Sequence, residues 1–87
     1  MKQRVYAIRD AKADVYLQPF FRKTHGEAER DFRTLVGDEK SMISKYPDDY
    51  DLYYLGDYDD QTGAIERLDT PTHVVKAVNF VQANLNS

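Results

Sequence analysis

The hydrophobic positions in the first quarter of the chain fall into two short segments rich in β-branched and aromatic residues. The segments cover residues 3–9 and 14–23, and residues 10–13 form a short connection between them. This composition is typical of β-strands, and the short connection is typical of neighbouring strands that run antiparallel. The pattern therefore predicts a β-hairpin at the start of the chain.

The second strand of this hairpin carries a further signal. Successive side chains of a strand point to opposite faces, so we expect Tyr16 and Phe20 on one face and Leu17 and Phe21 on the other. Pro19 cannot donate a backbone hydrogen bond to a neighbouring strand. The strand is therefore expected to lie at an edge of the sheet or to carry a bulge.

The next segment changes to the spacing of an amphipathic helix. Thr24 and Glu27 fit a capping box, and Gly37 stands where a C-terminal glycine would end the helix. A single apolar stripe is formed by Ala28, Phe32, Leu35 and Val36. The spacing predicts a helix between Thr24 and Gly37.

The second half of the chain repeats this order of elements. Residues 41–46 favour one helical turn that closes before Pro47. Residues 50–55 and 64–68 are predicted to pair as a second hairpin, with Gly63 at the turn position that requires a positive φ.

A final amphipathic helix is predicted from the residues that follow. Thr70 fits an N-cap, and Pro71 fits the first helical position. The apolar stripe of this helix is formed by Val74, Ala77, Val78, Val81 and Leu85. The whole order is β-β-α-β-β-α, so we expect one α+β domain over residues 1–87, with two helices on one face of a mainly antiparallel four-stranded sheet.

Composition agrees with a single globular domain. Of the 87 residues, 41% are hydrophobic and 31% are charged, a balance that is typical of a chain with one core. The absence of cysteine excludes a disulfide framework and a thiolate metal site, and it favours a reducing cytoplasm. The sequence contains neither an apolar signal segment nor a run of about 18 apolar residues, so no membrane span is predicted.

Charge is distributed unevenly along the chain. Residues 1–36 hold eight Lys and Arg against five acids, a net charge of +3, whereas residues 37–87 hold four against ten, a net charge of −6. The total of −3 argues against a protein that coats nucleic acid by its overall charge. The two halves are expected to present different surfaces.

No pattern in the sequence marks a catalytic or metal site. His25 and His73 are each expected in the first turn of a helix, and both lack the partner spacing of a zinc site. Residues 57–63 hold three carboxylates, but their spacing differs from that of a calcium loop. The four glycines form no phosphate-binding loop. We therefore predict a protein that is not an enzyme and holds no metal or cofactor.

The first hairpin interleaves cations with aromatic residues. This combination holds single-stranded nucleic acid, because cations contact the phosphates and aromatic rings stack on the bases. The candidate nucleic-acid-binding residues are Arg4, Arg9, Lys12, Tyr16, Phe20, Arg22 and Lys23. The alternative is that about half of the aromatic residues belong to the core, and that the cations protect an exposed sheet edge from aggregation.

Tyrosines are concentrated in the second hairpin, at positions 50, 53, 54 and 58. Tyrosine is enriched where protein surfaces meet. We therefore expect the chain to associate with itself as a homo-oligomer.

Two segments carry a family resemblance, YLQPFF at residues 16–21 and YDDQTG at residues 58–63. Shorter matches, among them KYP at residues 45–47, extend it over residues 4–68. On these residues the chain resembles the small nonstructural protein of gokushoviruses, tailless single-stranded DNA phages of the Microviridae, which is commonly described as a DNA-binding protein. The resemblance implies a binding protein that acts in the cytoplasm of the infected bacterial host, during viral DNA replication or packaging.

Two functions remain open at the level of sequence. In the first, the protein binds the single-stranded viral genome through its basic and aromatic hairpin. In the second, the acidic, tyrosine-rich hairpin docks on a viral or host replication or capsid-assembly protein, without direct contact to DNA.

Overall fold

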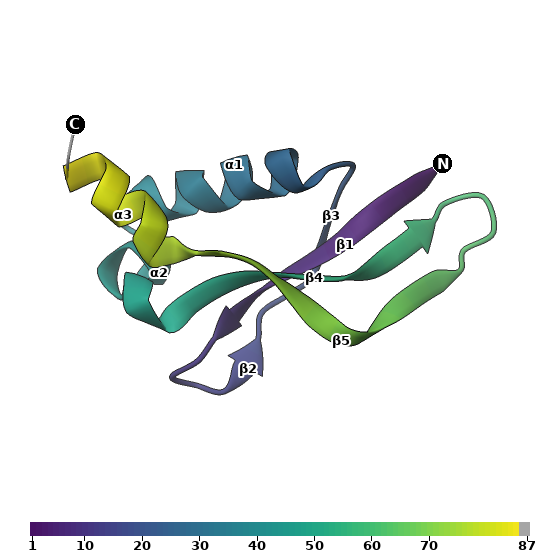
Figure 1. Ribbon diagram of the computed structural model, residues 1–87, viewed down its shortest axis with the longest axis horizontal. Coiled ribbons are helices and arrows are strands. Elements are labelled where there is room, and N and C mark those ends of the chain that lie inside the picture. Colours follow the sequence, from purple (N-terminus) through teal and green to yellow (C-terminus); the bar gives the residue numbers. More distant parts are fainter. Residues whose placement is uncertain (86–87) are drawn as a thin grey trace.

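The computed structural model describes the backbone of residues 1–85 and the side chains of residues 1–81. In chain order the elements are β1 (Lys2–Asp10), β2 (Val15–Tyr16), β3 (Phe20–Arg22), α1 (His25–Gly37), α2 (Met42–Lys45), the 3₁₀ turn η1 (Pro47–Asp49), β4 (Tyr50–Asp59), β5 (Ile65–Lys76) and α3 (Ala77–Leu85). Figure 1 shows α1 and α3 on the same side of a strongly twisted sheet, whose other side is not covered by any helix of the described chain. The predicted α+β class is confirmed.

All strand pairs of the sheet are antiparallel. The strand order is β2-β1-β4-β5, and β3 pairs with β1 further along the same edge as β2. The predicted second strand is divided in two, because Pro19 lies between β2 and β3 and has no backbone N–H to donate. Both pieces lie at an edge of the sheet, as Pro19 indicated.

The break at Pro19 also changes which side chains share a face. Leu17 and Phe20 line the same hollow beside Phe32 of α1, whereas Tyr16 lies on the other face of the sheet. The expectation that Leu17 and Phe20 occupy opposite faces is therefore wrong. Two-residue alternation holds only within an unbroken strand, and Pro19 interrupts this one.

The core lies between the sheet and α1. Tyr6 of β1 and Phe32 of α1 are completely buried. Of the predicted α1 stripe, Ala28 and Val36 are also buried, while Leu35 is 38% exposed at its margin. Burial of a large apolar side chain contributes about 1.5–3 kcal/mol. The contact between α1 and the central strands is therefore the main stabilising layer.

The helix α1 begins and ends close to the predicted residues. The Glu27 N–H donates to Oγ1 of the N-cap Thr24 over 3.2 Å, and the Glu27 carboxylate accepts from the Lys23 N–H over 3.0 Å. Gly37 is the last helical residue and Asp38 is the C-cap, so the helix ends two positions later than a C-terminal glycine signal predicts.

The C-terminal helix begins at Ala77, not at Pro71 as predicted. Residues 70–76 instead belong to β5, which runs beside β4. Val75 pairs with Leu52 and packs against the core from the strand. This segment is rich in β-branched residues, and β4 provides a pairing partner, so strand pairing overrides the local capping signal.

The predicted apolar stripe of the last helix is therefore shared between two elements. Val74 packs against the core from β5, and Val81 packs against it from α3. Phe80 was not assigned to the stripe, yet its ring meets that of Phe32 in a T-shaped contact with centroids 6.1 Å apart. Leu85 was also predicted for this stripe, but its side chain lies outside the described residues.

Gly56 lies at a bulge of β4, where the pairing with both neighbouring strands shifts. Leu55 is the extra residue between the pairs that Tyr54 and Gly56 form with β1. The backbones approach so closely that a Cβ atom on Gly56 would lie 2.2 Å from the carbonyl oxygen of Glu66 and 2.8 Å from the Cα of Arg67. Only glycine fits here without a shift of the backbone.

Replacement of Gly56 by alanine is expected to lower the free energy of unfolding by about 3 kcal/mol, the upper end of the range for overpacked sites. Gly37→Ala is the matched control, because no atom lies within 4 Å of a Cβ at Gly37. Alanine at that helical position should stabilise by about 0.4–1 kcal/mol. Urea unfolding followed by circular dichroism compares the two variants, and equal stabilities would contradict the close approach at the bulge.

Candidate nucleic-acid interface

Strand pairing divides the sheet into two faces with different chemistry. Side chains that lie directly opposite each other in an antiparallel pair share a face. One face packs against α1 and contains Tyr6, Ile8 and Leu52. The other face, called the open face below, is formed by Gln3, Val5, Ala7, Arg9, Tyr16, Phe21, Asp51, Tyr53, Leu55, Tyr58, Ile65, Arg67, His73 and Lys76.

Aromatic side chains take the place of a helix on the open face. Val5 and Ala7 are 7% and 0% exposed, although neither belongs to the core cluster beneath α1. Phe21 lies directly beside Val5, and Tyr53 lies directly beside Ala7. The rings therefore cover the central strands and keep part of their own surface in contact with solvent.

One half of the open face combines contacting aromatic rings with a cation. The Tyr53 ring lies between those of Tyr16 and His73, in T-shaped contacts with centroid distances of 5.5 and 5.3 Å. The guanidinium carbon of Arg9 lies 5.8 Å from the centroid of the Tyr16 ring. Nε2 of His73 is 2.9 Å from Oδ2 of Asp51, which orients the imidazole. We call Arg9, Tyr16, Tyr53 and His73 the aromatic platform.

The cation of the aromatic platform already has a carboxylate partner. The Arg9 guanidinium donates to Asp14, which adopts a φ of 60° in the turn between β1 and β2. The Asp14 side chain is 84% exposed. Exposed ion pairs contribute about 0–1 kcal/mol, so an anion that approaches the platform can replace Asp14 at small energetic cost.

The other half of the open face is apolar. The rings of Phe21 and Tyr58 contact each other with centroids 5.4 Å apart. Ile65 is 66% exposed and Phe21 is 40% exposed. Beside them is a hollow of about 270 Å³, called the apolar hollow below, lined by Val5, Pro19, Phe21, Leu55, Gly56, Ile65 and Arg67.

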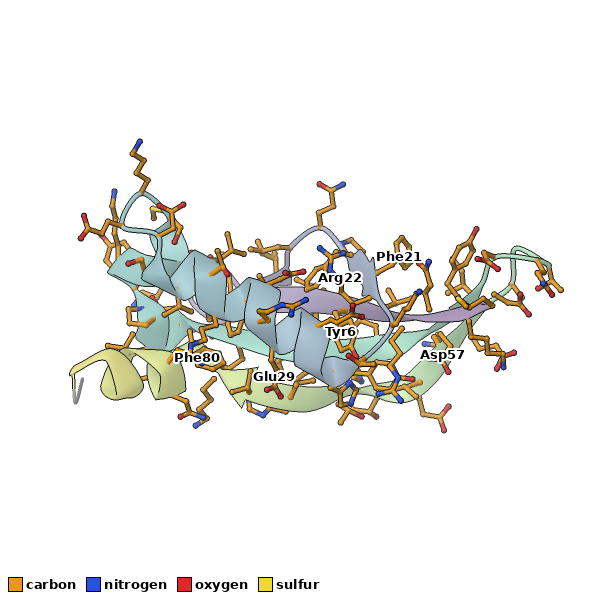
Figure 2. All side chains as sticks on the ribbon, turned by 90° about the horizontal axis from the view of Figure 1, so that it is seen from above. Tyr6, Phe21, Arg22, Glu29, Asp57 and Phe80 are labelled. Carbon is orange, nitrogen blue, oxygen red and sulfur yellow. The ribbon has the colours of Figure 1, made fainter. Side chains whose placement is uncertain are left out.

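Two of the predicted site residues, Phe20 and Arg22, lie on the face that carries α1. The Phe20 ring stacks on that of Tyr6 at 5.9 Å and packs against the core. The Arg22 guanidinium lies 5.5 Å from the Phe20 ring and hydrogen-bonds to Asp31 of α1. Figure 2 shows Arg22 and Tyr6 alongside this helix. In this structure both predicted residues contribute to the packing of α1 on the sheet.

Arg4, a third predicted residue, belongs to a polar cluster at the N-terminal end of α1. Its guanidinium lies 3.2 Å from Nδ1 of His25, which also hydrogen-bonds to the Tyr6 hydroxyl. A guanidinium can only donate, so Nδ1 of His25 is the acceptor of this contact. The Tyr54 ring faces Arg4 at 5.8 Å, and its hydroxyl donates to Oδ1 of Asp57 over 2.6 Å.

The last two predicted residues, Lys12 and Lys23, are exposed in connecting segments. Lys12 lies in the turn after β1, where its backbone N–H donates to Oδ1 of Asp10 over 3.0 Å. Lys23 immediately precedes the N-cap of α1. Neither is part of the aromatic platform.

Of the predicted residues, Arg9 and Tyr16 meet on the open face, where Tyr53 and His73 join them, whereas Phe20 and Arg22 meet on the face that carries α1. His73 was missed because its strand was predicted as the start of a helix. The alternation of apolar and polar or aromatic side chains along β4 was the available signal for Tyr53. It could not reveal which residues of other strands lie beside that ring.

The polar cluster raises the pKa of two tyrosines. The hydrogen bond to Asp57, together with burial, raises the pKa of Tyr54 to about 12. Burial raises the pKa of Tyr6, although the hydrogen bond with Arg4 opposes this shift. Both hydroxyls therefore stay neutral at a pH where a free tyrosine ionises.

Stability is expected to fall as the pH rises from 10 towards 12. The unfolded chain loses the Tyr54 proton near the ordinary value of 10.0, whereas the folded chain holds it to about 12, so alkaline pH favours the unfolded state. Asp57→Asn should move the pKa of Tyr54 back towards 10.0, because the amide carries no charge. Nuclear magnetic resonance titration of labelled tyrosine measures this pKa, with the exposed Asp60→Asn as control. An unchanged value in Asp57→Asn would contradict the assigned hydrogen bond.

Two kinds of feature are absent from the part of the chain that the structure describes. Within it, no group of three or more His, Asp and Glu side chains is arranged to hold a metal ion. None of its helices is long and apolar enough to cross a membrane.

Comparison with known proteins places the chain in a family. The model of the Phage ORF5 protein family matches residues 3–80, which is most of the 87-residue chain. No curated protein and no solved structure matches it. The matched range includes β2 to β5 and all of β1 except Lys2, and with them the aromatic platform and the apolar hollow. The chain therefore belongs to the Phage ORF5 protein family.

Proposed function

We propose that this phage protein binds single-stranded DNA through the aromatic platform, without catalysing a reaction, in the cytoplasm of the infected bacterium. The observation that carries the proposal is the contact series of Tyr16, Tyr53 and His73 beside Arg9, on the face that α1 and α3 leave uncovered. Single-stranded DNA exposes the ring faces of its bases. Stacking of a base on an aromatic side chain contributes about 1–3 kcal/mol.

Cations on the same face supply contacts for phosphates. Arg9 and Lys76 flank Asp51 in one row across the sheet. If these two cations each neutralise one phosphate, the logarithm of affinity should fall with the logarithm of salt concentration at a slope of about −1.4. Local charge on the open face thus allows binding by a chain whose net charge is −3.

The family supports a role in the phage life cycle, and the likeness to gokushovirus proteins supports a single-stranded genome as the ligand. Replication or packaging of that genome is the stage at which unpaired DNA has to be covered. In this proposal the protein holds the strand by stacking and phosphate contacts, with no preference for sequence.

Docking on a viral or host replication or capsid-assembly protein is the second candidate function. It is favoured by the carboxylate partners of two cations, Asp14 for Arg9 and Asp31 for Arg22, which already neutralise part of the basic hairpin. In this alternative the exposed acids of the second hairpin meet a basic partner, and DNA makes no direct contact.

Tyr16→Ala is expected to weaken the binding of a labelled oligothymidine about 5- to 150-fold, because it removes stacking worth about 1–3 kcal/mol. Tyr16 is 43% exposed, so its replacement should leave the fold intact. Tyr46→Ala is the matched control, since Tyr46 is a 53% exposed tyrosine at the end of α2, outside the open face. Fluorescence anisotropy at low salt compares both variants with the wild type.

Two outcomes would decide against DNA binding through the aromatic platform. One is a wild-type protein that leaves the oligonucleotide free at about 50 mM salt, where phosphate contacts are strong. The other is equal affinity of the Tyr16 and Tyr46 variants. Capture of a phage or host protein that survives nuclease treatment would then support the docking alternative.

A further inference from the structure

The apolar half of the open face presents a protruding side chain next to a recess. Ile65 has 66% of its surface exposed, the largest fraction among the apolar residues of β5 and its neighbours on this face. The apolar hollow beside it is bounded by Val5, Pro19, Phe21 and Leu55. Burial of the Ile65 side chain in an interface would be favourable, because the free energy falls by about 25 cal/mol for each Å² of apolar surface that is removed from water.

Ile65 and the apolar hollow lie on one face of one molecule. A two-fold interface joins the same patch of both partners, so each residue that inserts into the partner must lie near the recess that receives its counterpart. Ile65 and the apolar hollow satisfy this condition, because Ile65 itself forms part of the rim of the hollow. A single patch is thus self-complementary in shape.

Charges at the rim agree with the same arrangement. Arg67 is the cation that lines the apolar hollow, and Asp69 follows two residues later in β5 as an exposed acid. Neither forms an ion pair with another described residue. Alternation along β5 places Asp69 on the same face as Arg67, about 7 Å further along the strand. This part of the face therefore holds both signs of charge and can pair with a second copy of itself.

We propose that a second copy of this chain covers the apolar hollow, with Ile65 of each copy inserted into the hollow of the other. A nucleobase is a poorer occupant, because Arg67 is the only lining side chain with a polar group and the base edges would lose their hydrogen bonds to water. Val5 and Arg9 are four residues apart on β1, about 13 Å at the spacing of a strand. The dimer contact and the aromatic platform therefore occupy different halves of the open face.

Sedimentation velocity over a range of concentrations tests this proposal. The wild-type chain is expected to form a reversible dimer, and Ile65→Asp should weaken self-association at least 10-fold. Ile65→Lys tests the same site with the opposite charge. Met42→Asp is the matched control, because Met42 is 55% exposed on α2, outside the open face, and this variant should dimerise like the wild type.

A wild-type chain that stays monomeric up to about 1 mM, the limit of weak specific association, would overturn the proposal. It would also be overturned if both Ile65 variants dimerise as strongly as the wild type, with folding checked by circular dichroism. Anisotropy with the oligonucleotide separates this result from DNA binding. Monomeric Ile65→Asp that still binds DNA supports a separate dimer contact, whereas a monomeric wild type whose Ile65→Asp variant loses DNA would make the hollow a DNA contact instead.

Discussion

The pairing of β1 with β4 is the interaction on which the rest of the structure depends. It extends along the whole of β1, from Lys2 opposite Asp59 to Asp10 opposite Tyr50. Register decides which side chains face α1, since a slip of one residue moves every side chain to the opposite face. The bulge beside Gly56 adds one residue to β4. Because of it, Tyr54 on one side of the register shift and Asp57 on the other both share the face of β1 that lies beneath α1.

The two faces use the same residue types in different ways. Beneath α1, the hydroxyls of Tyr6 and Tyr54 hydrogen-bond within a polar cluster that also holds Arg4, because buried polar groups need partners. On the open face, Tyr16 and Tyr53 contact each other edge to face and cover the small residues of β1. Strand register thus decides whether a tyrosine serves the core or a surface.

The two proposed interactions would reinforce each other. A dimer joined at its apolar hollows carries two aromatic platforms, and a strand held by one platform is kept at a high local concentration near the second. Binding of a long single strand would then be much tighter than binding of a short one, without any new contact. This arrangement would let a small acidic chain bind DNA with only a few cations on each open face.

Local signals in the sequence were enough to predict both hairpins, the cap of α1 and the turn at Gly63, which has a φ of 76°. The remaining features depend on contacts between distant segments. Pro71 carries a helix-start signal, yet its segment pairs with β4, and Phe20 faces the core because Pro19 breaks the alternation. Tyr53 and His73 meet only after strands distant in sequence have paired. Each of these outcomes depends on hydrogen bonds and burial between remote segments, which outweigh the local preference of a few residues.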